Sequence, residues 1–267
     1  MIMHSVSMID THCHLTQVNS AIQQKILNAP ASPTMIAVST TLSDIQALLA
    51  LYGKWVQQKT QKSVHLPDLY PAIGLHPWFL PNTEQELSLH LTQLENLMAA
   101  HEQVWIAVGE IGLDFSAKVE ASKALQIQAF QSQLKLAQKF ELPVSIHAVK
   151  SHAVLQPLLK QFAKVKGAVH GFYGSLELAL SYVKLGFKIG VGPALLRPEP
   201  NKLIRVVQEL PLENLLLETD FPNGLCEGVQ QPADIVQVAA RVARLKQISV
   251  FEVQSSCDHT AKELFKL

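Results

Sequence analysis

Eight short runs of apolar and β-branched residues alternate with longer segments of helical periodicity along this 267-residue chain. We expect these runs to be strands, bounded as Val6–Ile9, Thr34–Ser39, Leu69–Ile73, Trp105–Val108, Pro143–Ile146, Gly167–Val169, Phe187–Val191 and Asn214–Leu217. Helical patterns fill the gaps, as in residues 124–140, where Leu125, Phe130 and Leu134 lie on an apolar stripe. Eight strand–helix units in a chain of this length predict an α/β fold, a TIM (β/α)8 barrel, as one domain over residues 1–267.

The remaining helical patterns give the barrel its expected outer layer. The helices are expected at Leu42–Gln61, Glu84–Ala100, Ala124–Phe140, His152–Ala163, Leu176–Leu185, Lys202–Glu209, Ala233–Arg244 and Val250–Phe265. A doubly wound open sheet is the alternative for such alternation. That fold usually carries a Gly-rich phosphate-binding fingerprint after the first strand, and no such fingerprint is present in this sequence.

Composition narrows the classes of function. The formal net charge is zero, so the chain lacks the global basic character of many proteins that bind nucleic acid, and any such contact must be local. Three cysteines without paired spacing predict a reducing compartment and no disulfide framework. No apolar run reaches the ~20 residues of a membrane span, and no signal-peptide pattern is visible. We therefore expect a cytoplasmic protein that does not contact a membrane.

Two histidines in a His-x-His pattern follow the first expected strand. Alternate side chains of a strand share a face, so His12 and His14 project the same way and can reach one metal ion. Cys13 lies between them and is expected to point towards the packing layer. The pattern therefore predicts the beginning of a metal site.

Histidines and carboxylates follow six of the eight expected strands, at the ends where barrel enzymes place their catalytic groups. They are Asp10, His12 and His14, then His76, then Glu110 and Asp114, then His147, then His170, and finally Glu218 and Asp220. A single histidine at a strand end is more often structural, and a carboxylate such as Asp220 can simply cap a helix. A charge such as Glu110 after an apolar strand is costly unless it is paired or metal-bound. Convergence of six polar strand ends on one face predicts a metal site.

Several of these residues lie in longer motifs. They are Asp10-Thr11-His12-Cys13-His14-Leu15, Gly74-Leu75-His76-Pro77-Trp78, Gly109-Glu110-Ile111-Gly112-Leu113-Asp114 and Leu217-Glu218-Thr219-Asp220. Through them the chain resembles the TatD family of metal-dependent hydrolases, from about residue 7 to the C-terminus. Within that family it looks nearer to the YjjV-like branch than to the best-studied nucleases.

The resemblance implies an amidohydrolase-like barrel with two divalent cations. The implied ligands are His12, His14 and Asp220 for the first ion, His147 and His170 for the second, and Glu110 for both. His76 and Glu218 match family residues near the site that are not first-choice ligands. Characterised members are divalent-metal-dependent deoxyribonucleases, several of them exonucleases from the 3′ end, so DNA is the implied substrate.

The residue types suit hydrolysis. Two cations can clamp the attacking and leaving oxygens of a phosphodiester and lower the pKa of a bound water. Asp220 is the candidate catalytic residue, as the general base that accepts the proton of that water. A mixed nitrogen and oxygen ligand set without sulfur is compatible with Zn²⁺, Mn²⁺ or Mg²⁺.

Two departures from the family pattern affect the expected substrate. Many members carry an arginine two residues after the fifth-strand histidine, where this chain has Val149 with Lys150 beside it. Many carry a Lys-Asn-Ala-like run after the seventh strand, where this chain has residues 195–198. Loops in that region of a barrel often bind phosphate, so Arg197 is a candidate phosphate contact and Lys150 a candidate substrate contact.

Three functions remain open at this point. The first is a deoxyribonuclease or phosphodiesterase acting on DNA, with ends or single strands as the expected substrates. The second is a hydrolase of a small ester, amide or phosphodiester, which the neutral charge and the missing arginine favour. The third is a non-catalytic metal-bound binding protein, against which the complete ligand set argues. A monomer is expected in each case.

Overall fold

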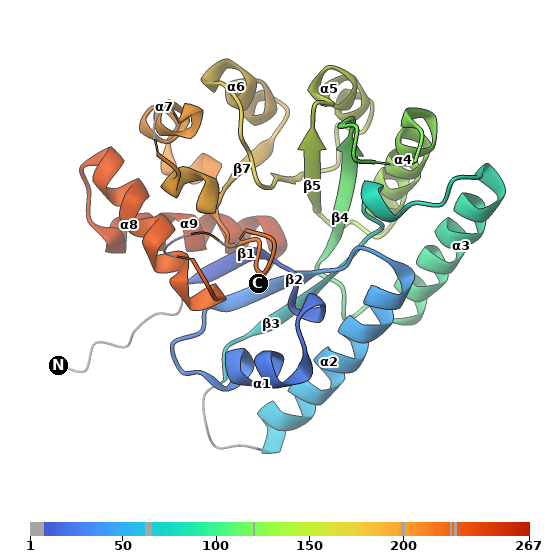
Figure 1. Cartoon of the computed structure of the whole chain (residues 1–267), viewed down its shortest axis with the longest axis horizontal. Helices are drawn as coiled ribbons and strands as arrows, with labels where there is room; N and C mark the ends of the chain where they lie inside the picture. The colour runs from blue at the N-terminus through green and yellow to red at the C-terminus, as the bar shows by residue number, and fades with distance from the viewer. Residues whose placement is uncertain (1–7, 62–65, 120, 199–200, 225, 227–228) are drawn as a thin grey trace.

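The computed structural model describes residues 8–61, 66–119, 121–198, 201–224, 226 and 229–267. Its central feature is a sheet of eight parallel strands in the order β1 to β8, surrounded by helices (Figure 1). The strands are β1 Ile9–Cys13, β2 Thr34–Val38, β3 Leu69–Ile73, β4 Ala107–Asp114, β5 Val144–Val149, β6 Gly167–Val169, β7 Phe187–Val191 and β8 Leu215–Leu217. This is the predicted TIM barrel, because sequential parallel strands with helical crossovers curl into one closed layer.

The first strand and the segment after the last strand close the barrel. Cys13 forms a parallel bridge with Phe221. The backbone N–H of Asp220 donates to the carbonyl of His12 at 2.9 Å, and the hydroxyl of Thr11 donates to the carbonyl of Leu217 at 2.9 Å. Strands β1 and β8 are therefore held together around the same residues that carry the His-x-His motif.

The α-helices form the outer layer. They are α1 Ser20–Asn28, α2 Leu42–Gln61, α3 Glu84–Ala100, α4 Lys123–Lys139, α5 His152–Gln161, α6 Leu176–Lys184, α7 Lys202–Glu209, α8 Ile235–Lys246 and α9 Val250–Phe265. Side-chain caps begin several of them, as at Thr83 for α3 and Ser122 for α4. The predicted stripe on α4 is buried, including Phe130 and Leu134. Within the described part of the chain, no helix is both long and apolar enough to cross a bilayer.

The described strands and helices differ from the expected elements in several places. Strand β1 begins at Ile9, whereas Val6 and Ser7 of the expected strand lie outside the described residues. Strand β4 continues to Asp114, where the apolar pattern predicted an end at Val108. Helix α1 was not predicted. The extension of β4 has a physical reason: apolar periodicity marks segments that bury one face, and it misses strand residues such as Glu110 and Asp114, whose side chains are polar.

Helix α9 covers the end of the barrel at which the strands begin. Ala261 and Phe265 of α9 belong to one buried cluster with barrel-interior residues that include Ile9 and Leu216. The carboxylate of Asp258 accepts the backbone N–H of Ile9 at 2.9 Å, which fixes the helix to the beginning of β1. The opposite end, at the carboxyl ends of the strands, is left for the polar residues.

Candidate metal centre

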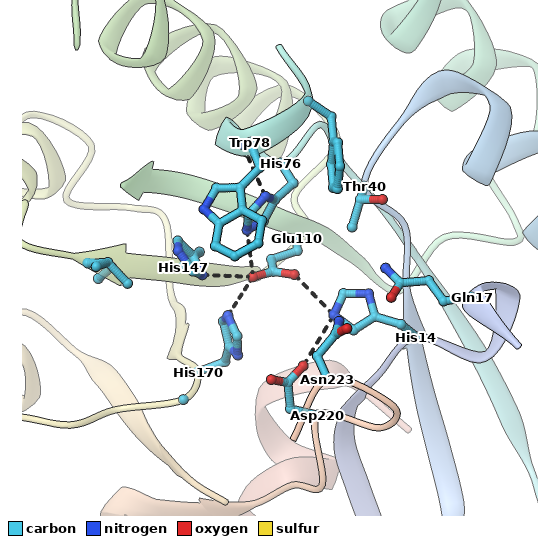
Figure 2. Close-up of a pocket in the computed structure, with 14 residues that line it drawn as sticks. His14, Gln17, Thr40, His76, Trp78, Glu110, His147, His170, Asp220 and Asn223 are labelled. Atoms are coloured by element: carbon cyan, nitrogen blue, oxygen red, sulfur yellow. Dashed lines mark hydrogen bonds and ion pairs between the residues drawn. The ribbon is translucent and has the colours of Figure 1, made fainter. Parts of the chain in front are cut away.

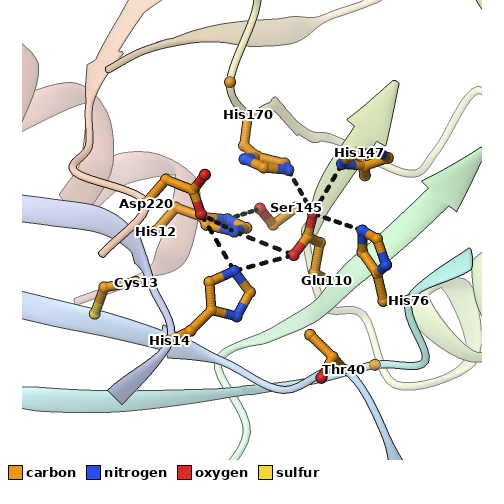
Figure 3. Close-up of polar contacts among 12 residues, drawn as sticks. His12, Cys13, His14, Thr40, His76, Glu110, Ser145, His147, His170 and Asp220 are labelled. Carbon is orange, nitrogen blue, oxygen red and sulfur yellow. Dashed lines mark hydrogen bonds and ion pairs between the residues drawn. The ribbon is translucent and has the colours of Figure 1, made fainter. Parts of the chain in front are cut away.

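The six predicted ligands come from strands and from the turns that follow them, and they meet around Glu110 (Figure 3). His12 lies within β1, Glu110 within β4 and His147 within β5. The others follow their strands: His14 begins the 3₁₀ helix Leu15–Gln17, His170 follows β6, and Asp220 follows β8.

Local irregularities in two strands direct ligands inward. The pairing register shifts between Val108 and Ile111 in β4, around Glu110, and between Asp10 and Cys13 in β1, around His12. Such bulges re-aim side chains next to active sites. Gly112 has φ +149°, and a Cβ there would lie 2.0 Å from the carbonyl oxygen of His147, so glycine lets β4 pass close to β5.

One oxygen of Glu110 faces the first group of residues. Its Oε2 lies 3.4 Å from Nε2 of His12 and 3.2 Å from Nε2 of His14. Oδ1 of Asp220 lies 3.3 Å from the same nitrogen of His14 and 3.9 Å from that of His12. His12, His14 and Glu110 satisfy the spacing of a metal-ligand group.

The other oxygen faces a second group. Oε1 of Glu110 lies 3.1 Å from Nδ1 of His147 and 2.6 Å from Nε2 of His170. Nε2 of His76 lies 3.2 Å from the same oxygen. His170 lies between the groups, because its ring also stacks on that of His12 with centroids 3.8 Å apart. A single buried carboxylate thus bridges two clusters of imidazole nitrogens.

Unpaired buried nitrogens test whether metal fits these residues. Nε2 of His12 and both ring nitrogens of His170 are buried and lack a well-aligned hydrogen bond to any described atom, although both Nε2 atoms lie close to the carboxylate of Glu110. Leaving polar atoms buried and unpaired is costly, whereas a cation would bind their lone pairs. Imidazole nitrogens and carboxylate oxygens are also the donors that divalent first-row metals accept. The residues therefore fit a divalent cation site.

Two of the predicted ligand imidazoles, those of His12 and His147, are oriented by neighbours that the sequence did not single out for this role. Nδ1 of His12 lies 2.9 Å from the hydroxyl of Ser145. Nε2 of His147 lies 3.1 Å from Oδ2 of Asp114. Partners of this kind fix the tautomer of a histidine and direct its other nitrogen to metal. Ser145 precedes His147 by two residues on β5, and this shared strand face is the sequence signal that could have identified it.

His76 differs from the predicted ligand histidines in the partner of its Nδ1, which is a backbone N–H. Its Nδ1 accepts the backbone N–H of Trp78 at 3.1 Å at the start of the 3₁₀ helix Pro77–Phe79. An accepting Nδ1 carries no proton, so neutral His76 is protonated at Nε2. That nitrogen donates to Glu110, although His76, Glu110 and His147 also satisfy ligand spacing. His76 is thus a hydrogen-bond donor to Glu110 in this structure, and its expected place beside the metals stays a prediction.

The ionisable residues of the cluster shift one another's pKa values. Burial opposes the ionised form of Glu110, but the surrounding histidines, His76 and His170 first, hold its pKa well below the usual value. Burial disfavours protonated His14, yet hydrogen bonds to Asp220 and Glu110 outweigh it and raise its pKa to about 10. Burial, with the nearby charge of His170, lowers the pKa of His12 to about 4. Glu110 is therefore ionised and able to bind cations.

Glu218 is a buried carboxylate next to His170, at the edge of the cluster. It is 1% exposed, and its carboxylate accepts the backbone N–H of Gly171 and lies 3.9 Å from Nδ1 of His170. Burial raises its pKa to about 8. A Cβ at Gly190 would lie 2.4 Å from this carboxylate, so the glycine of β7 makes room for it.

A cavity of about 420 Å³ opens onto the cluster (Figure 2). His14, Glu110 and Asp220 line it, with Trp78 and Val149 among its other walls. No lysine or arginine is among its lining residues in the described part of the chain.

Two predicted substrate contacts lie elsewhere. Lys150 is exposed and does not line this cavity, and Arg197 lines a separate cavity with Arg241 and Arg244. Their roles in substrate binding stay predictions. Cys13 points away from the cluster, as expected, and packs in the core with its thiol 3.6 Å from the carbonyl oxygen of Ile36 (Figure 3). Asp220 caps no helix, because a bridge and a turn follow it.

Comparison with known proteins gives a consistent result over the whole barrel. Residues 9–266 match the family described as TatD related DNase. An Escherichia coli K12 protein named uncharacterized metal-dependent hydrolase YjjV is 35% identical over 240 residues, covering 88% of this chain and 86% of the relative. The human deoxyribonuclease TATDN3 is 27% identical over 275 residues, covering 97% of this chain and 95% of the relative.

Solved structures agree. The crystal structure of YjjV, a TatD homologue from E. coli K12, superposes with a TM-score of 0.85 at 32% identity, covering 97% of this chain and 98% of that one. A TatD-family hydrolase from Entamoeba histolytica superposes with a TM-score of 0.79 at 22% identity, covering 97% and 98%, and shares the fold.

Proposed function

The chain belongs to the TatD-related DNase family of metal-dependent hydrolases, and we propose that it cleaves phosphodiester bonds of DNA at a site holding two divalent cations. The main observation behind the proposal is that the two carboxylate oxygens of Glu110 face different groups of histidines. The name deoxyribonuclease, borne by the human relative, supports DNA as the substrate.

The proposed ligands follow the two groups of side chains that face the carboxylate oxygens of Glu110. His12, His14 and Asp220 would hold one cation and His147 and His170 the other, with Glu110 shared between them. When bound, two such cations clamp a phosphodiester between them and lower the pKa of a water molecule. Zn²⁺, Mn²⁺ and Mg²⁺ all suit the nitrogen and oxygen donors.

The chain's own residues supply the proton chemistry. Burial opposes ionisation of Asp220, but the hydrogen bond from His14 and the charges of nearby histidines hold its pKa below the usual value. Its side chain is 25% exposed at the cavity, so the carboxylate can accept a proton from an attacking water. His76 can donate from Nε2 to a phosphate oxygen, because its Nδ1 is occupied by the backbone.

The test is cleavage of end-labelled single- and double-stranded DNA after chelation, with Mg²⁺, Mn²⁺ or Zn²⁺ added back. We expect metal-dependent cleavage that Asp220→Asn and His147→Ala each abolish while circular dichroism shows a folded protein. Matched controls are Asp68→Asn, which removes an exposed carboxylate paired with Lys59, and His259→Ala, which removes an exposed histidine. Full activity in either site variant would refute the proposed roles, and the product ladder gives the expected 3′ polarity.

A small-molecule ester, amide or phosphodiester is the second candidate substrate. It is favoured by the absence of lysine and arginine from the described cavity wall, where Ala148 and Val149 contribute apolar surface. A panel of p-nitrophenyl phosphodiesters, esters and amides separates the two candidates. Turnover of panel members without cleavage of DNA, in protein loaded with two ions, would favour the small substrate. A monomeric state and a cytoplasmic location stay predictions.

A further inference from the structure

Trp78 is an exposed tryptophan at the wall of the metal cavity. It is 47% exposed, whereas the other two tryptophans, Trp55 and Trp105, are 7% and 4% exposed. Phe79 beside it is 49% exposed and lines the same cavity. Aromatic side chains that line a concave site, together with a few polar groups, are typical of pockets that bind ligands.

The orientation of Trp78 is fixed from three sides. Its indole N–H donates to Oδ2 of Asp114 at 2.6 Å. Its ring lies nearly perpendicular to those of His76 and His147, with interplanar angles of 77° to each. Figure 2 shows the indole beside His76 and above Glu110. A polar edge anchored inside and an apolar face left at the cavity make a rigid surface with little rotamer freedom to lose on binding.

We propose that Trp78 is the platform on which the nucleobase next to the scissile phosphodiester stacks. The inference rests on the proposed function and deepens it. Cations and His76 would bind the phosphate, so the described cavity wall leaves its apolar part for the base. Stacking tolerates any base, because every base has a π-face. A cavity of about 420 Å³ lies within the usual range of small-molecule sites and suits one nucleotide and not a base-paired end.

Trp78 is also connected, through Asp114, to His147, one of the proposed metal-binding residues. Oδ2 of Asp114 accepts the indole N–H of Trp78 and lies 3.1 Å from Nε2 of His147. Trp78 thus has two separable parts: an aromatic face for the base, and an N–H that helps to hold Asp114. Replacement by phenylalanine removes the N–H and keeps a face, whereas leucine removes both.

The first experiment is a cycle of two substrates and three proteins. The substrates are a single-stranded oligonucleotide and its copy with one abasic residue at the end that is cleaved, and the proteins are wild type, Trp78→Phe and Trp78→Leu. We expect the abasic residue to raise KM about tenfold in wild type, in line with stacking measured elsewhere. The penalty should persist in reduced form in Trp78→Phe and vanish in Trp78→Leu. Tyr173→Leu, which removes an equally exposed aromatic side chain outside the cavity lining, should keep the full penalty.

The outcomes separate the alternatives. If Trp78 only braces Asp114, Trp78→Phe and Trp78→Leu lower kcat alike and the abasic penalty is the same in all proteins, which would overturn stacking. Absence of cleavage of either oligonucleotide by wild-type protein would refute the proposed function and this inference with it.

A binding measurement checks the platform without turnover. We expect thymidine monophosphate to quench tryptophan emission of the Mg²⁺-loaded protein, because Trp78 is the half-exposed tryptophan. The quenching should disappear in Trp78→Phe. Binding detected by calorimetry without any change in wild-type emission would overturn the proposal.

Discussion

At the scale of single residues, histidines close together in the site have different hydrogen-bond partners. The rings of His76 and His147 have centroids 4.5 Å apart. His147 has a carboxylate at each nitrogen, Glu110 at one and Asp114 at the other, whereas Nδ1 of His76 accepts a backbone N–H. The partner of the second nitrogen therefore distinguishes an expected ligand from an expected donor.

For His76 we expect a loss of turnover without a loss of metal. His76→Ala should keep two bound ions per chain and lower kcat about 100-fold, as removal of one donor to a developing oxyanion does elsewhere. Metal analysis after dialysis and steady-state kinetics measure the two effects. His170→Ala is the comparison, since it should lose an ion. Loss of one ion from His76→Ala would make His76 a ligand.

The hydroxyl of Ser145 should act on metal affinity. Ser145→Ala removes the partner of His12 Nδ1, and changes of this kind typically weaken metal binding about 10- to 100-fold. Titration with a competing chelator measures it. Ser32→Ala removes a buried hydroxyl that donates to the carbonyl of Ile26, away from the metal cluster, and should leave the affinity unchanged. Equal affinities in wild type and Ser145→Ala would contradict the role.

At the scale of elements, the two ends of the barrel have separate functions. The carboxyl ends of the strands carry His12, Glu110 and His147, whereas α9 covers the opposite end with Phe265 and Ala261. Bulges in β1 and β4 occur at predicted ligand positions, where inward direction of a side chain outweighs a regular ladder. Substitutions at the two ends should therefore affect different properties.

Phe265 should contribute to stability alone. Phe265→Ala empties the part of the barrel that α9 fills and should lower the free energy of unfolding by about 3–5 kcal/mol. Urea unfolding of the metal-loaded protein measures the loss. Phe251→Ala on the same helix removes a side chain that is 71% exposed and should change stability little. Equal stability of the two variants would show that α9 does not close the barrel.

At the scale of the whole molecule, metal and protons compete for one buried cluster. In the metal-free protein, burial is outweighed at His14 and at His147 by hydrogen bonds to carboxylates, which raise the pKa values to about 10 and about 9. Both exceed the ordinary value of 6.5. These protons stabilise the folded state below pH 6.5, and that contribution is lost as the pH rises through the folded pKa values. Burial also raises the pKa of Glu218 to about 8, which acts in the same direction.

The metal-free protein should therefore become less stable between pH 6.5 and 9. Cations replace these protons, so the metal-loaded protein should show a much weaker decline, and metal binding should tighten as the pH rises. Thermal unfolding with and without chelator, and calorimetry in buffers of different ionisation enthalpy, measure both effects. A melting temperature of the metal-free protein that rises over this interval would contradict the assignment.

Local patterns determined the order of the elements, because a strand or helix that buries an apolar face carries its periodicity in the sequence. Strands β3, β6 and β7 and helices α2, α3, α7 and α9 have the predicted bounds. The His-x-His motif and the polar strand ends likewise indicated the cluster, since parallel strands of a barrel bring their carboxyl ends together.

Only the tertiary structure decided which side chains contact each other. Ser145 reaches His12 from 133 residues away, and Trp78 and His147 meet at the same oxygen of Asp114. Arg197 lies beside Arg241 and Arg244, away from the metal cavity that its position after β7 suggested. Such pairings depend on register, bulges and side-chain direction across separate strands, and no local pattern records them. The chain's periodicity specifies the barrel, whereas the packing between its strands sets the tautomers and the shape of the site.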